Sequence, residues 1–148
     1  MKQRIWWIVV SLLAISVGIF AYVYRAELWG ENSMHGEHHL DAYLVSGKYE
    51  KFDESKLSLA REKTVVLFFS ASWCPSCTLF NAEMKEFAET LPDSVLILAV
   101  DYDERFEMRK KYKVAYQHTF VVVDENGGEL KRWSGGGVDR LKAELNLK

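Results

Sequence analysis

The stretch from Thr64 to Cys77 reads TVVLFFSASWCPSC and joins an apolar run to the two cysteines of this 148-residue chain. The run Thr64–Ala71 is continuous in β-branched and aromatic residues, which is typical of a strand buried on both faces. The apolar residues after it recur at the spacing of one helix face and stop before Pro92: Phe80, Met84, Phe87, Ala88 and Leu91. We therefore expect a buried strand that leads, through the cysteines, into a helix.

Cys74 falls where this helix should begin, because Pro75 suits the first helical position, where a missing N–H costs nothing. A sulfur that caps a helix accepts N–H bonds from the first turn and faces the positive end of the helix dipole, which favours the thiolate. We predict that Cys74 is the catalytic nucleophile. Cys77, one turn further on and more shielded, is predicted to resolve a mixed disulfide formed at Cys74.

Other roles for the two cysteines fit the sequence less well. A zinc knuckle uses the same spacing but needs a second pair of ligands of the same kind, which a chain with two cysteines lacks. Two inert core thiols would not explain their place at the start of a helix. A disulfide across two residues closes too short a loop to stabilise the fold much. A chemical role for the pair is therefore favoured.

The rest of the chain from residue 47 onward alternates between strand and helix patterns. We expect a short edge strand over residues 47–53, a helix over 54–63, a second buried strand over 94–100, a charged helix over 103–113, a hairpin over 119–136 that turns at 126–128, and a final helix from Val138. This order predicts an α/β fold in which a central mixed sheet has helices on both faces.

The N-terminal segment has the pattern of a membrane anchor. Lys2 and Arg4 precede an uncharged, apolar run from Ile5 to Tyr24. At about 1.5 Å per residue, a helix over this run would be ~30 Å long, the thickness of a bilayer's hydrocarbon core. Its aromatic end lacks the small residues of a signal-peptide cleavage site. We predict that residues 1–25 form an uncleaved, single-pass transmembrane helix.

The charges around this run predict its orientation. Positive residues favour the cytoplasmic side, and Lys2 and Arg4 precede the run, whereas glutamates offset Arg25 after it. We therefore expect a cytoplasmic N-terminus and a catalytic domain that is periplasmic or extracellular, where disulfides persist. Residues 26–46 show no period and are predicted to be a linker to a folded domain over residues 47–148.

Overall charge argues against nucleic acid as a partner. Nineteen lysines and arginines stand against 21 acidic residues, a net charge of -2, and the basic residues form no block. The linker contains side chains that can bind soft or borderline metals, namely Met34, His35, His38 and His39. Such clusters in a solvated tether are more often spacers, and we interpret them in that way.

The order of elements, with WCPSC at the junction of strand and helix, resembles the thioredoxin superfamily over about residues 47 to 147. Together with the predicted anchor, it resembles the membrane-bound bacterial members of the TlpA/ResA type. The resemblance implies exchange with protein thiols and disulfides and no cofactor beyond a redox-active Cys74–Cys77 disulfide. It also implies that Trp73 shapes the docking surface. The loop at Gln117 and His118, with Thr119, would hold the substrate backbone. A reductase of this type would need a membrane protein as electron donor.

Two positions depart from that family. Its members usually have a cis-proline before a threonine beside the cysteines, and His118 stands in that place here. We expect a trans bond before His118. Its imidazole can stabilise the thiolate, carry a proton, act as a third metal ligand, or simply fill the loop. The buried aspartate that usually precedes the motif is Phe68, so Glu83 or His118 would have to substitute for it.

Two functions follow from these residues. The first is an extracytoplasmic thiol–disulfide oxidoreductase. The alternative is a copper- or zinc-handling protein that binds metal through Cys74, Cys77 and His118, with the linker's Met34 and histidines as an entry site. The two-residue spacing of the cysteines suits exchange, and it favours the oxidoreductase.

Overall fold

The structure is a computed structural model that describes residues 42–45 and 47–147. The chain divides into two units, Met1–Glu37 and His38–Lys148, and the fold described below belongs to the second. The predicted anchor, residues 1–25, and most of the predicted linker lie outside the described residues. Within the described part of the chain, no helix has both the length and the apolar character needed to cross a bilayer.

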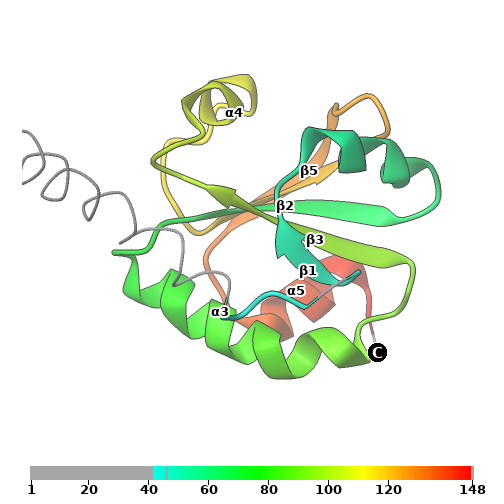
Figure 1. Cartoon of the computed structure of the whole chain (residues 1–148), viewed down its shortest axis with the longest axis vertical. Coiled ribbons are helices and arrows are strands. Elements are labelled where there is room, and N and C mark those ends of the chain that lie inside the picture. The colour runs from blue at the N-terminus through cyan, green and yellow to red at the C-terminus, as the bar shows by residue number, and fades with distance from the viewer. Residues whose placement is uncertain (1–41, 46, 148) are drawn as a thin grey trace, which may run out of the picture. The chain divides into compact units, whose positions relative to one another are not determined.

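Five strands form one mixed sheet in the order β1-β3-β2-β4-β5 (Figure 1). Their bounds are β1 Tyr49–Lys51, β2 Thr64–Ser70, β3 Val95–Asp101, β4 Thr119–Val123 and β5 Glu129–Ser134. Strands β1, β3 and β2 run parallel, whereas β4 is antiparallel to both β2 and β5. The predicted mixed sheet and its terminal hairpin are confirmed, and the hairpin turns at Gly127, which has a φ of 70°.

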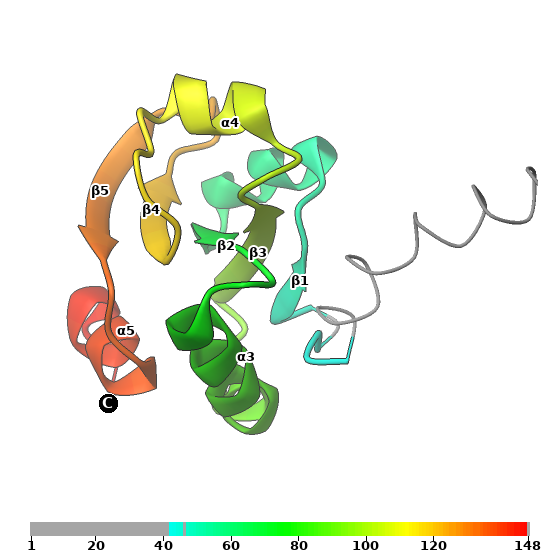
Figure 2. The ribbon, with the colours of Figure 1, turned by 90° about the vertical axis from the view of Figure 1, so that its left-hand side faces the viewer.

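Helices cover both faces of this sheet, as predicted (Figure 2). Helices α3 (Pro75–Phe87) and α5 (Val138–Leu145) lie on one face, and α4 (Phe106–Lys111) and the 3-10 helix η2 (Glu54–Arg61) lie on the other. Alternate residues of β2 supply the two cores: Val66 and Phe68 pack toward α3 and α5, and Val65, Leu67 and Phe69 pack toward η2 and α4. Both faces of β2 are therefore buried, which explains its uninterrupted apolar sequence.

The segment expected to be a helix over residues 54–63 is a 3-10 helix over Glu54–Arg61. Asp53 caps its start, since its side chain accepts the main-chain N–H of Ser55 at 2.9 Å, and the hydroxyl of Ser58 donates to the Ser55 carbonyl at 3.0 Å. The Ser58 bond competes with the α-helical ladder. Leu57 is the one buried residue of η2, so tertiary packing adds little support for an α-helix.

Other elements differ from expectation mainly at their ends. Helix α3 stops at Phe87 and continues as a short 3-10 helix, η3 (Ala88–Thr90), so Leu91 is buried but not helical. Helix α4 begins three residues later than expected, because the Asp101 carboxylate accepts the main-chain N–H groups of Asp103 and Glu104, each at 2.8 Å. These two bonds hold a turn at the end of β3, before α4 starts.

A buried hydrogen bond ties the edge strand β1 to α3. The hydroxyl of Tyr49 donates to Asn81 Oδ1 at 2.6 Å, and both side chains are buried. Burial raises the pKa of Tyr49 far above its usual range, so the hydroxyl keeps its proton and remains a donor. The helix that carries the cysteines is thus held to the sheet by a polar contact as well as by packing.

Candidate functional site

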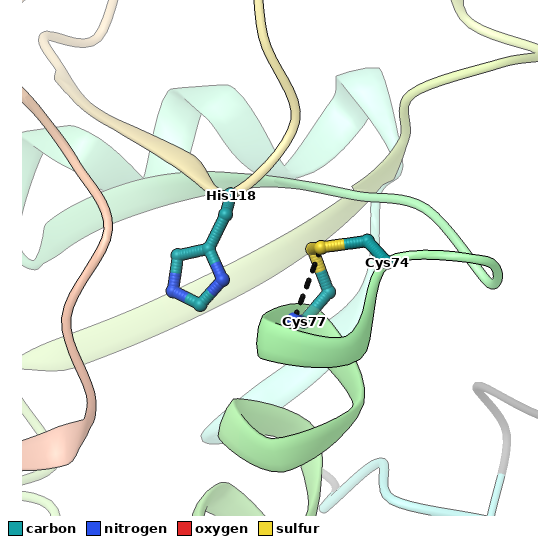
Figure 3. Close-up of side chains that lie close together, drawn as sticks. All are labelled: Cys74, Cys77 and His118. Carbon is teal, nitrogen blue, oxygen red and sulfur yellow. Dashed lines mark hydrogen bonds between the residues drawn. A yellow bond between two sulfur atoms is a disulfide. The ribbon is translucent and has the colours of Figure 1, made fainter.

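The two cysteines lie where β2 leads into α3, and they form a disulfide (Figure 3). Cys74 has an extended backbone, with φ -90° and ψ 110°, and Pro75 is the first residue of the helix. The main-chain N–H of Cys77 donates to Cys74 Sγ at 3.2 Å. The prediction that Cys74 caps the helix is therefore confirmed. A sulfur in this position is stabilised as a thiolate when the disulfide is reduced.

Both cysteines of the pair are buried. Cys77, which was expected to be the more shielded thiol, is fully buried, and Cys74 is only 1% exposed, so the disulfide is covered at both ends. Its neighbours Trp73 and Ser76 are exposed instead. Trp73 is 59% exposed, and its indole N–H donates to the Asp103 carboxylate at 2.7 Å. The rim of the site therefore offers a fixed aromatic surface, while the sulfurs lie just beneath it.

The backbone of His118 is held on two sides. No peptide bond in the described part of the chain is cis, which agrees with the trans bond expected before His118. The residue has a φ of 55°, in the left-handed region that few non-glycine residues adopt. Its N–H donates to the Phe69 carbonyl at 2.7 Å, and its own carbonyl accepts the N–H of Gly135 at 2.8 Å. These two bonds hold the strained conformation next to the end of β2.

The imidazole of His118 points at the sulfurs (Figure 3). The ring is buried, and its Nε2 lies 2.8 Å from the carbonyl oxygen of Gly136, which can only accept a hydrogen bond, so Nε2 carries the proton. In the neutral ring, Nδ1 is then an acceptor, and it has no partner among the described residues. The two sulfurs and a ring nitrogen of His118 all lie within 4.8 Å of one another. The predicted proximity of His118 to the pair is confirmed.

Aromatic rings surround the imidazole. Its centroid is 5.4 Å from the ring of Phe68, 5.9 Å from that of Phe80 and 5.5 Å from that of Phe120. Phe68 occupies the position at which members of the superfamily that the sequence resembles usually have a buried aspartate. Of the two proposed substitutes, Glu83 caps α5 by accepting the Val138 N–H at 3.0 Å, whereas His118 clusters with the sulfurs. His118 is therefore the better placed of the two for chemistry at the cysteines.

The other predicted substrate contacts lie on the loop before β4. Thr119 is buried, and its hydroxyl donates to the Tyr116 carbonyl at 2.8 Å and lies 2.9 Å from the hydroxyl of Ser134. This side chain thus serves the fold. Gln117 is half-buried, and its main-chain N–H and carbonyl bond to no other described residue. Its backbone can therefore pair with an extended peptide that lies against the cysteines.

Sequence reasoning missed the loop Gly135–Gly137, which reaches the site from the end of β5. Gly136 supplies the carbonyl that fixes the His118 ring and has a φ of 93°, which favours glycine. A Cβ on Gly137 would lie 2.6 Å from Glu83 Oε2. Three consecutive glycines between a strand and a helix were the available signal, because such a run permits a close approach of the backbone.

Comparison with known proteins identifies the family. Residues 44–146, more than half of the chain, match the Thioredoxin family. The chain belongs to the thioredoxin family. It is 33% identical over 88 residues to Thioredoxin-T of Drosophila melanogaster, which covers 60% of this chain and 55% of that protein. It is 38% identical over 84 residues to Thioredoxin H2-1 of Oryza sativa subsp. japonica, which covers 57% of this chain and 59% of that protein.

A solved structure agrees with this assignment. The X-ray structure of Fasciola hepatica thioredoxin is 28% identical, with a TM-score of 0.56, and the match covers 63% of this chain and 88% of that one. The chain spans less than two thirds of the length of the two curated thioredoxins above. The shared part is the α/β domain that carries Cys74 and Cys77.

Proposed function

We propose that this thioredoxin-family chain is a thiol–disulfide oxidoreductase that acts on protein disulfides. The observation that carries the proposal is the capped Cys74 sulfur with Cys77 one turn away in the same helix. In the reduced protein, the Cys74 thiolate attacks a substrate disulfide, forms a mixed disulfide and releases one substrate thiolate, which takes up a proton. Cys77 then loses its proton and attacks Cys74 Sγ. The second substrate thiol leaves, and two electrons have passed from the chain to the substrate.

We further propose that the domain works outside the cytoplasm, anchored by residues 1–25, and is reduced again by a membrane protein. Support comes from the charge and hydropathy pattern of the N-terminal segment, which is also the basis for placing the chain with the TlpA/ResA type. In intact cells that produce the full chain, a membrane-impermeant thiol reagent should label the reduced cysteines. Labelling that occurs only after lysis would contradict this location.

Metal handling is a second candidate, favoured by one observation. Nδ1 of the buried His118 lacks a partner among the described residues, and a ring nitrogen of this residue and the two sulfurs all lie within 4.8 Å of one another. Two thiolates and one imidazole nitrogen form a donor set that suits Cu(I) or Zn(II). Such a site requires reduced cysteines, because the sulfurs of a disulfide are not thiolate ligands. Met34 and the linker histidines, interpreted as spacers or an entry site, lie outside the described residues.

One experiment separates the two candidates. The reduced chain is equilibrated with glutathione buffers of graded potential, and bound copper and zinc are measured in the same samples. We expect a single two-electron transition, reduction of a protein disulfide by the dithiol form, and no stoichiometric metal. One metal ion per chain that is lost in His118→Ala, together with no exchange above a Cys74→Ser control, would instead establish the metal-handling role.

A further inference from the structure

A pocket of about 240 Å³ lies beside the disulfide, between α3 and the loop Gly135–Gly137. It begins at Ser76, whose hydroxyl is 3.3 Å from Cys74 Sγ, and ends at the half-buried carboxylate of Glu83. Leu79 and Phe80 form its apolar wall. Pockets for small-molecule ligands usually enclose about 300–1,000 Å³, so this one is of the size to take a single side chain.

The glycine loop leaves the carboxylate end of this pocket open. Any side chain at Gly137 would meet Glu83, since its Cβ would lie 2.6 Å from Oε2. At Gly136, a Cβ would lie 2.7 Å from the Cβ of Arg140. The approach of the loop to α3 therefore depends on the lack of a side chain at Gly137, and the wall that faces α3 consists of His118 and the main chain of Gly136 and Gly137.

The carboxylate of Glu83 lacks a cation within the described part of the chain. Among the described residues it accepts one hydrogen bond, from the Val138 N–H at 3.0 Å, although two carboxylate oxygens can accept about four. Arg140 packs against Gly136 but directs its guanidinium to Glu144 and to the Ser134 carbonyl. A half-buried carboxylate without a counter-ion favours a cationic ligand.

The apolar wall of the pocket also favours such a ligand, because part of this wall is exposed to solvent. Leu79 is 63% exposed although it lies on the helix that carries the cysteines. Lysine and arginine have a long methylene stem that covers apolar surface and a charged head that reaches beyond it. One such side chain would cover the exposed part of Leu79 and place its cation at Glu83.

We propose that this pocket binds the side chain of a lysine or arginine close to the reacting cysteine of the substrate. The proposal rests on the exchange activity proposed above, for which it names the preferred substrate class. Glu83 is seven residues along α3 from Ser76, or about 10 Å at the helical rise. A basic residue one or two positions from the substrate cysteine spans that distance, since an extended chain advances about 3.3 Å per residue and the side chain covers the rest.

The test uses three disulfide-bonded peptides that differ only at the residue next to the cysteine, which is lysine, its uncharged isostere norleucine, or glutamate. We measure kcat/KM for their reduction by the reduced full chain. We expect the lysine peptide to exceed the norleucine peptide by roughly 3- to 30-fold, which corresponds to about 0.7–2 kcal/mol, and the glutamate peptide to be the slowest. The lysine preference should decrease as the salt concentration rises.

Two variants with the same change of charge separate the pocket from long-range attraction. Glu83→Gln keeps an oxygen for the Val138 N–H but removes the charge, and it should reduce the ratio of lysine to norleucine rates to about one. Glu86→Gln lies on the exposed surface of the same helix and should retain the ratio. The proposed role of the pocket would be overturned if the ratio of lysine to norleucine rates fell equally in both variants, or if it did not change in Glu83→Gln.

The proposed activity and the pocket fail in different ways. Exchange with the norleucine peptide and no lysine preference contradict the pocket and leave the activity standing. A lack of exchange with all three peptides contradicts both. If Glu83→Gln does not fold, the wild-type chain provides the test. A lysine preference that is absent, or that does not change with salt concentration, excludes an ion pair between Glu83 and the substrate lysine.

Discussion

Replacing Cys77 with serine should turn the chain into a covalent trap for its substrate. Cys74 would keep the helix cap and Pro75, so its attack on a substrate disulfide continues. The mixed disulfide then has no neighbouring thiolate to break it. Intramolecular attack has an effective molarity of about 10⁵ M or more, so turnover should fall by at least roughly 10³-fold. Mass spectrometry of the unreduced protein should show one substrate chain linked to Cys74.

The control for this trap is Cys74→Ser, which leaves Cys77 as the single thiol. The sulfur of Cys77 is not at the helix cap, so its thiolate lacks that stabilisation and we expect no adduct under the same conditions. Equal adducts in both variants would contradict the assignment of nucleophile and resolving thiol. Because Cys74 is itself 1% exposed in the disulfide form, this comparison tests the role of the cap rather than a difference in burial.

The parts of the site that could be predicted from sequence are those fixed by neighbours in the chain. The run of β2 and the position of Pro75 are enough to predict the junction of strand and helix, because both act through local backbone preferences. The cap at Cys74 follows from that junction. Such features depend on a few consecutive residues and not on the rest of the fold.

The parts that were missed arise between segments distant in sequence. Glu83 and Val138 are 55 positions apart, and the Gly136 carbonyl that orients His118 belongs to a loop beyond the hairpin. Neither contact leaves a periodic pattern. The 3-10 geometry of η2 was missed for a different reason, because the Ser58 bond and the single buried leucine outweigh an intrinsic helix preference that is weak.

His118 was placed beside the cysteines by the family pattern, but its backbone shows why this chain does not carry the family's proline there. Proline fixes φ near -65°, whereas His118 has a φ of 55°. Proline also lacks the N–H that His118 donates to the Phe69 carbonyl at 2.7 Å. The surrounding loop therefore suits a residue that has a main-chain N–H to donate and a left-handed backbone.

Substituting His118→Pro should consequently destabilise the protein, although it restores the residue usual in the family. Backbone strain of about 1–3 kcal/mol and an unsatisfied buried carbonyl of about 1–3 kcal/mol should together lower the free energy of unfolding by roughly 2–6 kcal/mol. Urea denaturation measures this loss. His118→Asn is the matched control, because it also removes the imidazole but keeps the N–H and tolerates a left-handed φ, so it should cost distinctly less. A proline variant as stable as the asparagine variant would show that the loop can rebuild around proline and that the backbone of His118 does not account for the difference from the family.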